Sequence, residues 1–174
     1  YISFRAIGAA LTALLISFII GPKIIKKLKF KQIGETIRKD GPKTHLKKEG
    51  TPTMGGLIVL LAIILPTVLW ADILSKHILL ILISTIWMGL IGFLDDYLKV
   101  VKKSPPGLIA KYKMIGQISL GLFIGSTLLY YPDSTQYSTS ISLPFIANGT
   151  IDLMYLYIPL TILVITGTSN AVNL

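Results

Sequence analysis

Five long apolar stretches dominate this sequence and leave few ways for it to fold. They run over Ile2–Ile20, Thr53–Ala71, Ile78–Leu94, Met114–Tyr131 and Leu153–Val172. A helix needs about 20 mostly apolar residues to cross a bilayer. Only 14% of the residues are charged, whereas soluble domains carry about 25%. The sequence therefore predicts an all-α polytopic membrane protein, with residues 1–174 forming one membrane domain.

The lysines and arginines predict how these spans are oriented. Lys23–Lys48 contains ten of the 17 Lys and Arg residues and Lys99–Lys113 contains five, whereas Arg5 and Lys76 make up the rest. Positively charged loops stay in the cytoplasm. Loops 21–52 and 95–113 are therefore predicted to be cytoplasmic, and loops 72–77 and 132–152 external, with the N-terminus outside. Membrane topology and the attraction of lysines to anionic lipid headgroups explain the net charge of +9. The sequence has no basic patch interleaved with aromatic residues, so it does not indicate binding of nucleic acid.

The longer external loop contains signals for a small β-hairpin. Polar and apolar residues alternate over part of Gln136–Ile146, and Asn148-Gly149 follows. That dipeptide is typical of a tight hairpin turn, because both residues can adopt positive φ. We expect the second strand along Thr150–Leu153.

A glycine pair precedes the second apolar stretch and resembles an anion site. Gly55-Gly56 leaves the backbone uncovered where a helix starts, and helix N-termini attract anions. Thr53 offers a hydroxyl group and Lys48 a charge for phosphate. The alternative is a helix cap with small residues for packing.

Two adjacent aspartates, Asp95 and Asp96, end the third apolar stretch. Carboxylates at a helix C-terminus oppose the helix dipole and repel each other. Lys99 lies close enough along a helix to form a salt bridge, but exposed pairs stabilise little. The acidic pair therefore favours Mg²⁺–pyrophosphate chemistry or proton abstraction over a structural role.

Two amides end the fifth apolar stretch. Asn170 and Asn173 are three residues apart, so they share a helical face. They could bind a nucleotide or phosphate, or they could hydrogen-bond a neighbouring helix inside the membrane. His45 and His77 form no metal-binding spacing, and the chain has no cysteine.

Together these segments resemble the phospho-N-acetylmuramoyl-pentapeptide-transferase family, within the polyprenyl-phosphate N-acetylhexosamine-1-phosphate transferase superfamily. The matching segments are Gly50–Gly56, Gly92–Lys103, Gly107-Leu108, Lys111–Gln117 and Ser169–Leu174. The resemblance implies transfer of phospho-N-acetylmuramoyl-pentapeptide from UDP-N-acetylmuramoyl-pentapeptide to undecaprenyl phosphate, giving lipid I and UMP with Mg²⁺ as cofactor. It also implies a homodimer in the bacterial cytoplasmic (inner) membrane, with the active site facing the cytoplasm.

The resemblance assigns roles to particular residues of this chain. It implies that Asp95 and Asp96 are catalytic, with Asp95 favoured as the base that deprotonates the lipid phosphate. The implied substrate-binding residues are Lys48, Thr53, Lys99, Lys113, Asn170 and Asn173.

Family members have ten transmembrane helices, so the resemblance implies that these five belong to an N-terminal half. The main Mg²⁺ ligand is then expected beyond residue 174, in the remaining C-terminal half of the protein, and residues 1–174 alone are expected to be inactive. Two alternatives remain: a sibling transferase that uses UDP-N-acetylglucosamine, and half of a secondary transporter. Polar groups at one membrane face, instead of mid-membrane, argue against transport.

Overall fold

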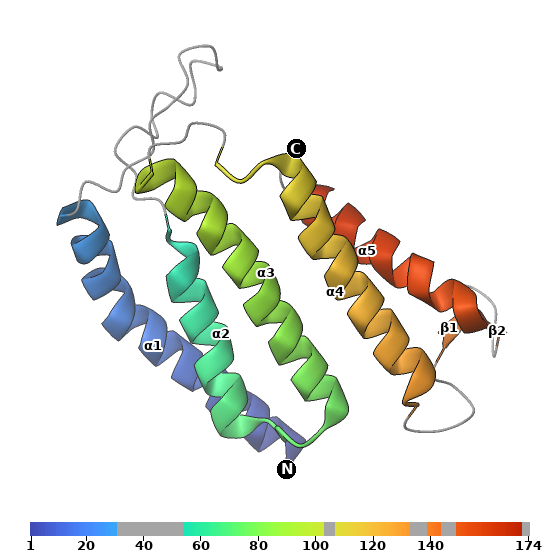
Figure 1. The fold of residues 1–174 in the computed structure, drawn as a ribbon. Coiled ribbons are helices and arrows are strands. Elements are labelled where there is room, and N and C mark those ends of the chain that lie inside the picture. The colour runs from blue at the N-terminus through green and yellow to red at the C-terminus, as the bar shows by residue number, and fades with distance from the viewer. Residues whose placement is uncertain (31–53, 103–106, 133–138, 144–148, 172–174) are drawn as a thin grey trace. The chain divides into compact units, whose positions relative to one another are not determined.

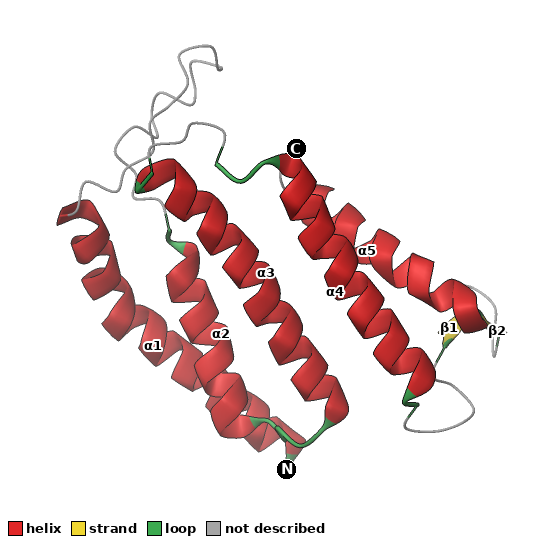
Figure 2. Cartoon of the chain, in the orientation of Figure 1, coloured by secondary structure: helices red, strands yellow, loops and turns green. Residues whose placement is uncertain are grey.

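The computed structural model describes residues 1–30, 54–102, 107–132, 139–143 and 149–171 of the chain. They belong to two compact units, Tyr1–Ile109 and Ala110–Leu174, each described by itself. The elements in chain order are α1 (Ile2–Phe30), α2 (Gly56–Trp70), α3 (Lys76–Val100), α4 (Ala110–Tyr130), β1 (Ser140–Ser142), β2 (Thr150–Asp152), the 3₁₀-helix η2 (Met154–Leu156) and α5 (Tyr157–Ala171) (Figures 1 and 2). The predicted all-α membrane fold with a small β-hairpin is confirmed.

The first unit packs α1 and α3 against α2, and Trp70 anchors the contact between α1 and α2. The Trp70 Nε1–H donates to Thr12 Oγ1 over 3.0 Å, and the Phe4 ring meets the indole edge-on at 5.8 Å. Arg5 donates from Nε to the Trp70 carbonyl oxygen. That bond satisfies a carbonyl at the end of α2, where helical partners run out. Gly8 lies against the indole ring, because a Cβ there would be 2.7 Å from it.

The second unit is a helical hairpin in which small residues of α4 let α5 pack closely against it. Gly121 and Gly125 lie on one face of α4, four residues apart. A Cβ on Gly121 would lie 2.7 Å from the Ile162 Cα, and one on Gly125 would lie 3.0 Å from the Ile158 Cα. This close backbone approach is typical of the GxxxG packing of membrane helices, where van der Waals contact replaces the hydrophobic effect.

The two strands form the predicted antiparallel hairpin. Ser140 pairs with Asp152 and Ser142 with Thr150, and the Leu143 N–H donates to the Gly149 carbonyl oxygen over 2.8 Å. The remaining turn residues, 144–148, lie outside the described residues. That the hairpin is external stays a prediction.

Two helices extend beyond the C-terminal ends of their predicted spans. α1 continues to Phe30, into the loop predicted from residue 21, and α3 continues to Val100, beyond Leu94. The thickness of the bilayer sets the length of the apolar run, but it does not set the length of the helix. Lysine and leucine are also good helix formers in water. Lysines near both helix ends, including Lys29 and Lys99, also interact favourably with the helix dipole.

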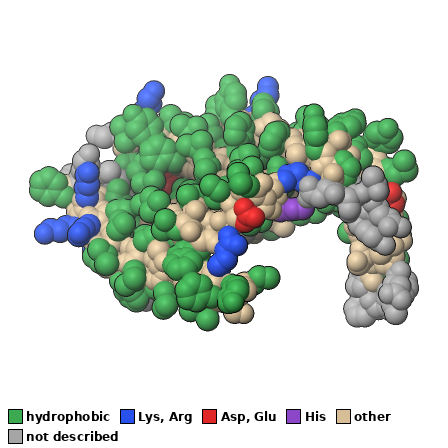
Figure 3. Space-filling view, turned by 90° about the horizontal axis from the view of Figure 1, so that it is seen from below, with side chains coloured by type: hydrophobic (Ala, Val, Ile, Leu, Met, Phe, Trp, Pro, Cys, Tyr) green, Lys and Arg blue, Asp and Glu red, His purple; other side chains and the backbone are tan. Residues whose placement is uncertain are grey.

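Hydrophobic side chains cover much of the surface, as expected for a protein in lipid (Figure 3). Among the described residues, the helices Ile2–Phe30, Lys76–Val100 and Met154–Ala171 are long and apolar enough to cross a membrane. α2 is apolar but has only 15 residues, which is about 22 Å of helix against a bilayer core of about 30 Å. Spans at α2 and α4 stay predictions.

Candidate active site

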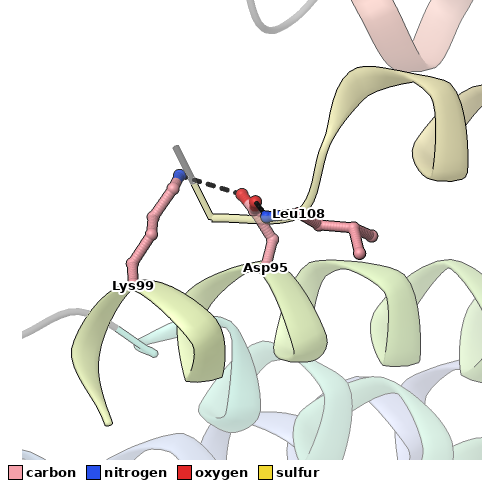
Figure 4. Close-up of polar contacts among 3 residues, drawn as sticks. All are labelled: Asp95, Lys99 and Leu108. Atoms are coloured by element: carbon pink, nitrogen blue, oxygen red, sulfur yellow. Dashed lines mark hydrogen bonds and ion pairs between the residues drawn. The ribbon is translucent and has the colours of Figure 1, made fainter. Parts of the chain in front are cut away.

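Asp95 lies in the last turns of α3 and bonds to the next turn of the same helix. Its Oδ2 lies 2.9 Å from the Lys99 Nζ (Figure 4). The two residues are four apart, the spacing at which helical side chains of opposite charge meet. The Asp95 side chain is 14% exposed, whereas that of Lys99 is 42% exposed. The carboxylate is thus largely covered, and the lysine remains accessible to a ligand.

The second oxygen of Asp95 is held by the segment that follows α3. The backbone N–H of Leu108 donates to Asp95 Oδ1 over 2.8 Å (Figure 4). Gly107, just before it, has φ +62°, a conformation that residues with a Cβ seldom adopt. One oxygen of the carboxylate therefore accepts from a lysine, and the other accepts from a fixed backbone amide.

Asp96 shares α3 with Asp95 but faces another direction. Successive residues are about 100° apart around an α-helix, and α3 runs unbroken through the acidic pair to Val100. The pair follows the apolar run as predicted, but the helix continues past it to Val100. Asp96 is half-buried. The two carboxylates cannot converge on one atom while this helix stays intact.

Asn170 lies in a polar contact between α4 and α5. The Asn170 Nδ2 donates to Gln117 Oε1 over 3.0 Å and to the Thr166 carbonyl oxygen over 2.8 Å. The Gln117 Nε2 in turn donates to Ser169 Oγ over 2.9 Å. Gln117 is only 3% exposed, and an unpaired amide would be costly at such a site. The helix-bonding alternative for Asn170 thus has direct geometric support.

The remaining predicted site residues are distributed as follows. Lys113 is half-buried on α4, one turn before Gln117, so it lies at the same end of the hairpin as Asn170. Lys48, Thr53 and Asn173 lie outside the described residues. The structure thus joins Asp95 with Lys99 in the first unit, and brings Lys113 and Asn170 to one end of the second.

The predicted anion site at the start of α2 is described from Met54 onward. Gly55 and Gly56 are exposed, and a Cβ on either would meet nothing within 4 Å. The Ile58 N–H already donates to the Gly55 carbonyl oxygen over 3.0 Å. The uncovered backbone agrees with the anion hypothesis, which stays a prediction.

Mg²⁺ has no ligand set in the described part of the chain. No group of three or more His, Asp or Glu side chains comes together there to hold a metal ion. Asp95 and Asp96 alone do not supply such a set, because their side chains diverge. No Mg²⁺ ligand is therefore assigned.

Two features of these sites were not predicted from the sequence. One is the Leu108 amide on Asp95, which Gly107 makes possible, and the other is Gln117 as the partner of Asn170. Pro105-Pro106-Gly107 is a turn signal directly after α3. Gln117 lies four residues before Gly121 in an apolar helix, a spacing that indicates a polar contact on a packed face.

Comparisons with known proteins agree with these observations. A model of glycosyl transferase family 4 matches residues 78–174, and signature 1 of phospho-N-acetylmuramoyl-pentapeptide-transferase matches residues 48–60. Proteins of that name from Desulforapulum autotrophicum, Citrifermentans bemidjiense and Endomicrobium trichonymphae are 50%, 48% and 47% identical to it. Each alignment covers 100% of this chain and 48% of the relative, so the chain spans about half the length of the curated relatives it matches. The resemblance seen in the sequence is confirmed, and the chain belongs to glycosyl transferase family 4.

Proposed function

We propose that the protein containing this chain transfers phospho-N-acetylmuramoyl-pentapeptide from its UDP-linked donor to undecaprenyl phosphate, giving lipid I and UMP. The observation that carries the proposal is the identity of 47–50% along the whole chain to proteins named phospho-N-acetylmuramoyl-pentapeptide-transferase. The signature match at residues 48–60 favours the muramoyl donor over UDP-N-acetylglucosamine. That segment includes Lys48 and Thr53, which we propose contact the substrate.

In this proposal Asp95 is the base that deprotonates the lipid phosphate, and Lys99 is the cation that binds the diphosphate of the donor. The phosphate of the lipid carrier loses its proton to Asp95 and attacks the phosphorus linked to the sugar. A new P–O bond forms to the lipid phosphate, the P–O bond to the UMP phosphate breaks, and UMP leaves. Lys99 stabilises the negative charge that shifts onto the oxygens of UMP. Support comes from the half-exposed Lys99 amine next to a nearly covered carboxylate.

Further parts of the proposal concern the second unit, the metal and the membrane. Lys113, Asn170 and Asn173 bind the nucleotide end of the donor, and Asp96 assists in catalysis. Mg²⁺ neutralises diphosphate charge when bound, and ligands for it lie in the C-terminal half of the protein. The protein is a homodimer in the bacterial cytoplasmic membrane. Its N-terminus is outside and its active site faces the cytoplasm, in agreement with the positive loops.

The test uses the full-length protein reconstituted with undecaprenyl phosphate. Each radiolabelled UDP-sugar is offered separately, and label in the lipid and released UMP are both measured. We expect lipid labelling from the muramoyl-pentapeptide donor, and Asp95→Asn should lower kcat about 10²–10⁴-fold, as loss of a general base does. Asp72→Asn, which changes a carboxylate in the predicted external turn, is the matched control and should leave kcat nearly unchanged.

Two results would count against the proposal. Label that enters lipid only from UDP-N-acetylglucosamine would reject the choice of sugar. Full turnover by Asp95→Asn would reject the catalytic assignment, even if the sugar is correct.

A further inference from the structure

The contact between Asp95 and Leu108 has a geometry that only glycine at position 107 permits. Gly107 is buried and has φ +62°. A Cβ at this position would lie 2.5 Å from Asp95 Oδ1 and 2.6 Å from the Lys99 Cε. Alanine would therefore strain the backbone and also push against the carboxylate.

We propose that Gly107 is a positioning residue for Asp95 in the transfer reaction. Its positive φ directs the Leu108 N–H onto Asp95 Oδ1, and this bond fixes the orientation of the carboxylate. The inference rests on the proposed function, because it takes Asp95 as the base. It adds a residue outside the predicted catalytic and substrate-binding set, and a reason why that residue is glycine.

Lys99 and Leu108 both bond to Asp95, but they differ in how easily they can leave it. Leu108 donates from the backbone at a part-buried position, 2.8 Å from Oδ1, so this donor stays in place unless the chain itself moves. Lys99 reaches Oδ2 through a long, flexible side chain that is 42% exposed. Ion pairs four residues apart on a helix stabilise little, so an incoming diphosphate can replace the carboxylate as partner of the lysine.

This difference assigns separate tasks to the two carboxylate oxygens. When Lys99 turns to the diphosphate, Oδ2 loses the lysine as a partner and accepts the proton from the lipid phosphate. Oδ1 stays bonded to Leu108, so the carboxylate does not rotate as the lysine leaves. The proton passes to water after UMP and the lipid product separate, and the carboxylate is restored.

The first experiment compares Gly107→Ala with Ile109→Ala in the full-length enzyme. Ile109 is 59% exposed, and Ile109→Ala keeps both Gly107 and the Leu108 N–H, so it controls for a general disturbance of this segment. Because misplacing a reacting group by about 1 Å costs about 10²-fold in rate, we expect Gly107→Ala to lower kcat about 100-fold. The KM of each substrate should change less than about threefold, since binding groups are retained. Loss of activity through raised KM alone would overturn the inference.

The second experiment asks whether Gly107 acts through Asp95. Gly107→Ala is combined with Asp95→Asn, and kcat is measured for the single and double variants. Residues that act as one unit show non-additive losses, so Gly107→Ala should cause little further loss once Asp95 has been replaced. An equal further loss, about 100-fold, in the double variant would show that Gly107 acts elsewhere.

A third variant covers the case in which Gly107→Ala fails to fold. Replacing Leu108 by its α-hydroxy acid removes the N–H, keeps the side chain and adds no Cβ at position 107. It should also lower kcat at nearly constant KM, and wild-type kcat would overturn the inference. Failure of the proposed function looks different, because Asp95→Asn would then remain active whatever the result at position 107.

Discussion

The contact between α4 and α5 predicts a large difference between glycine positions that look alike in sequence. Gly121 and Gly167 both lie in apolar helices, but a Cβ on Gly121 would be 2.7 Å from the Ile162 Cα, whereas one on Gly167 would meet nothing within 4 Å. Ordinary contact begins at 3.4 Å, so Gly121→Ala must move the two backbones apart by about 0.7 Å. A gap of about 0.5–1 Å already removes a quarter to a half of the dispersion energy of the atoms facing it.

The magnitude follows from two opposing terms. Overpacking of a tight contact costs about 1–3 kcal/mol, and alanine is better than glycine in a helix by about 1 kcal/mol. Because the obstacle at Gly121 is backbone, we expect a net loss of about 2 kcal/mol for Gly121→Ala. Gly167→Ala should gain about 0.5–1 kcal/mol, since only helix propensity changes.

The assay is unfolding of the full-length protein in mixed detergent micelles by increasing SDS, followed by far-ultraviolet circular dichroism. A companion pair tests the reasoning: at Gly89 the obstacle is the Leu60 side chain, with Cδ1 at 2.7 Å. Leu60→Ala should therefore restore most of the stability lost in Gly89→Ala. Ile162→Ala should restore only part of that lost in Gly121→Ala, because it removes the Ile162 Cγ1 at 2.9 Å but leaves the Cα at 2.7 Å. Equal stability of Gly121→Ala and Gly167→Ala would refute the argument. Full recovery of the stability of Gly121→Ala when Ile162→Ala is added would refute it as well.

Two further predictions concern polar contacts. A double-mutant cycle of Gln117→Ala and Asn170→Ala, measured by the same SDS unfolding, should give a coupling energy of about 0.6 kcal/mol and at most about 1.7 kcal/mol, the average and maximum for hydrogen bonds between membrane helices; a value of zero would contradict the contact. In the hairpin, the hydroxyl of Thr139 and the Met154 N–H donate to Asp152 and lower its pKa below the usual 3.8. A lowered pKa stabilises the fold above the unfolded-state pKa, and that stability is lost as pH falls through the folded value. The stability difference between wild type and Asp152→Asn should thus be constant above about pH 5 and shrink below about pH 4, and an equal difference at both pH values would disprove it.

The helices could be predicted from the sequence because the bilayer imposes a simple requirement on it. About 20 apolar residues in a row leave little choice but a helix, and each predicted span contains one. Helix ends were less predictable, because the length of an apolar run shows where the chain leaves the bilayer. It does not show where the last helical hydrogen bond is formed. α3 therefore extends past Leu94 to Val100.

The site could be predicted only where chemistry is local in the sequence. Asp95 and Lys99 are four residues apart, so helical spacing alone brings them together. The bond from Leu108 depends on how the segment after α3 returns to the helix, and a turn signal at Gly107 does not say which atom the turn approaches. The partner of Asn170 depends in the same way on the register of two helices, which Gly121 and Gly125 set by close packing.

The unbroken course of α3 through Asp95 and Asp96 has a genetic consequence. Since the two carboxylates face different surroundings, neither can take over the role of the other. An acid introduced one position away therefore does not restore the function of the original carboxylate. If Asp95 is the base as proposed, a strain that grows slowly because Asp95 has been replaced should recover by reversion of that codon, and not by new acids at nearby positions of the helix.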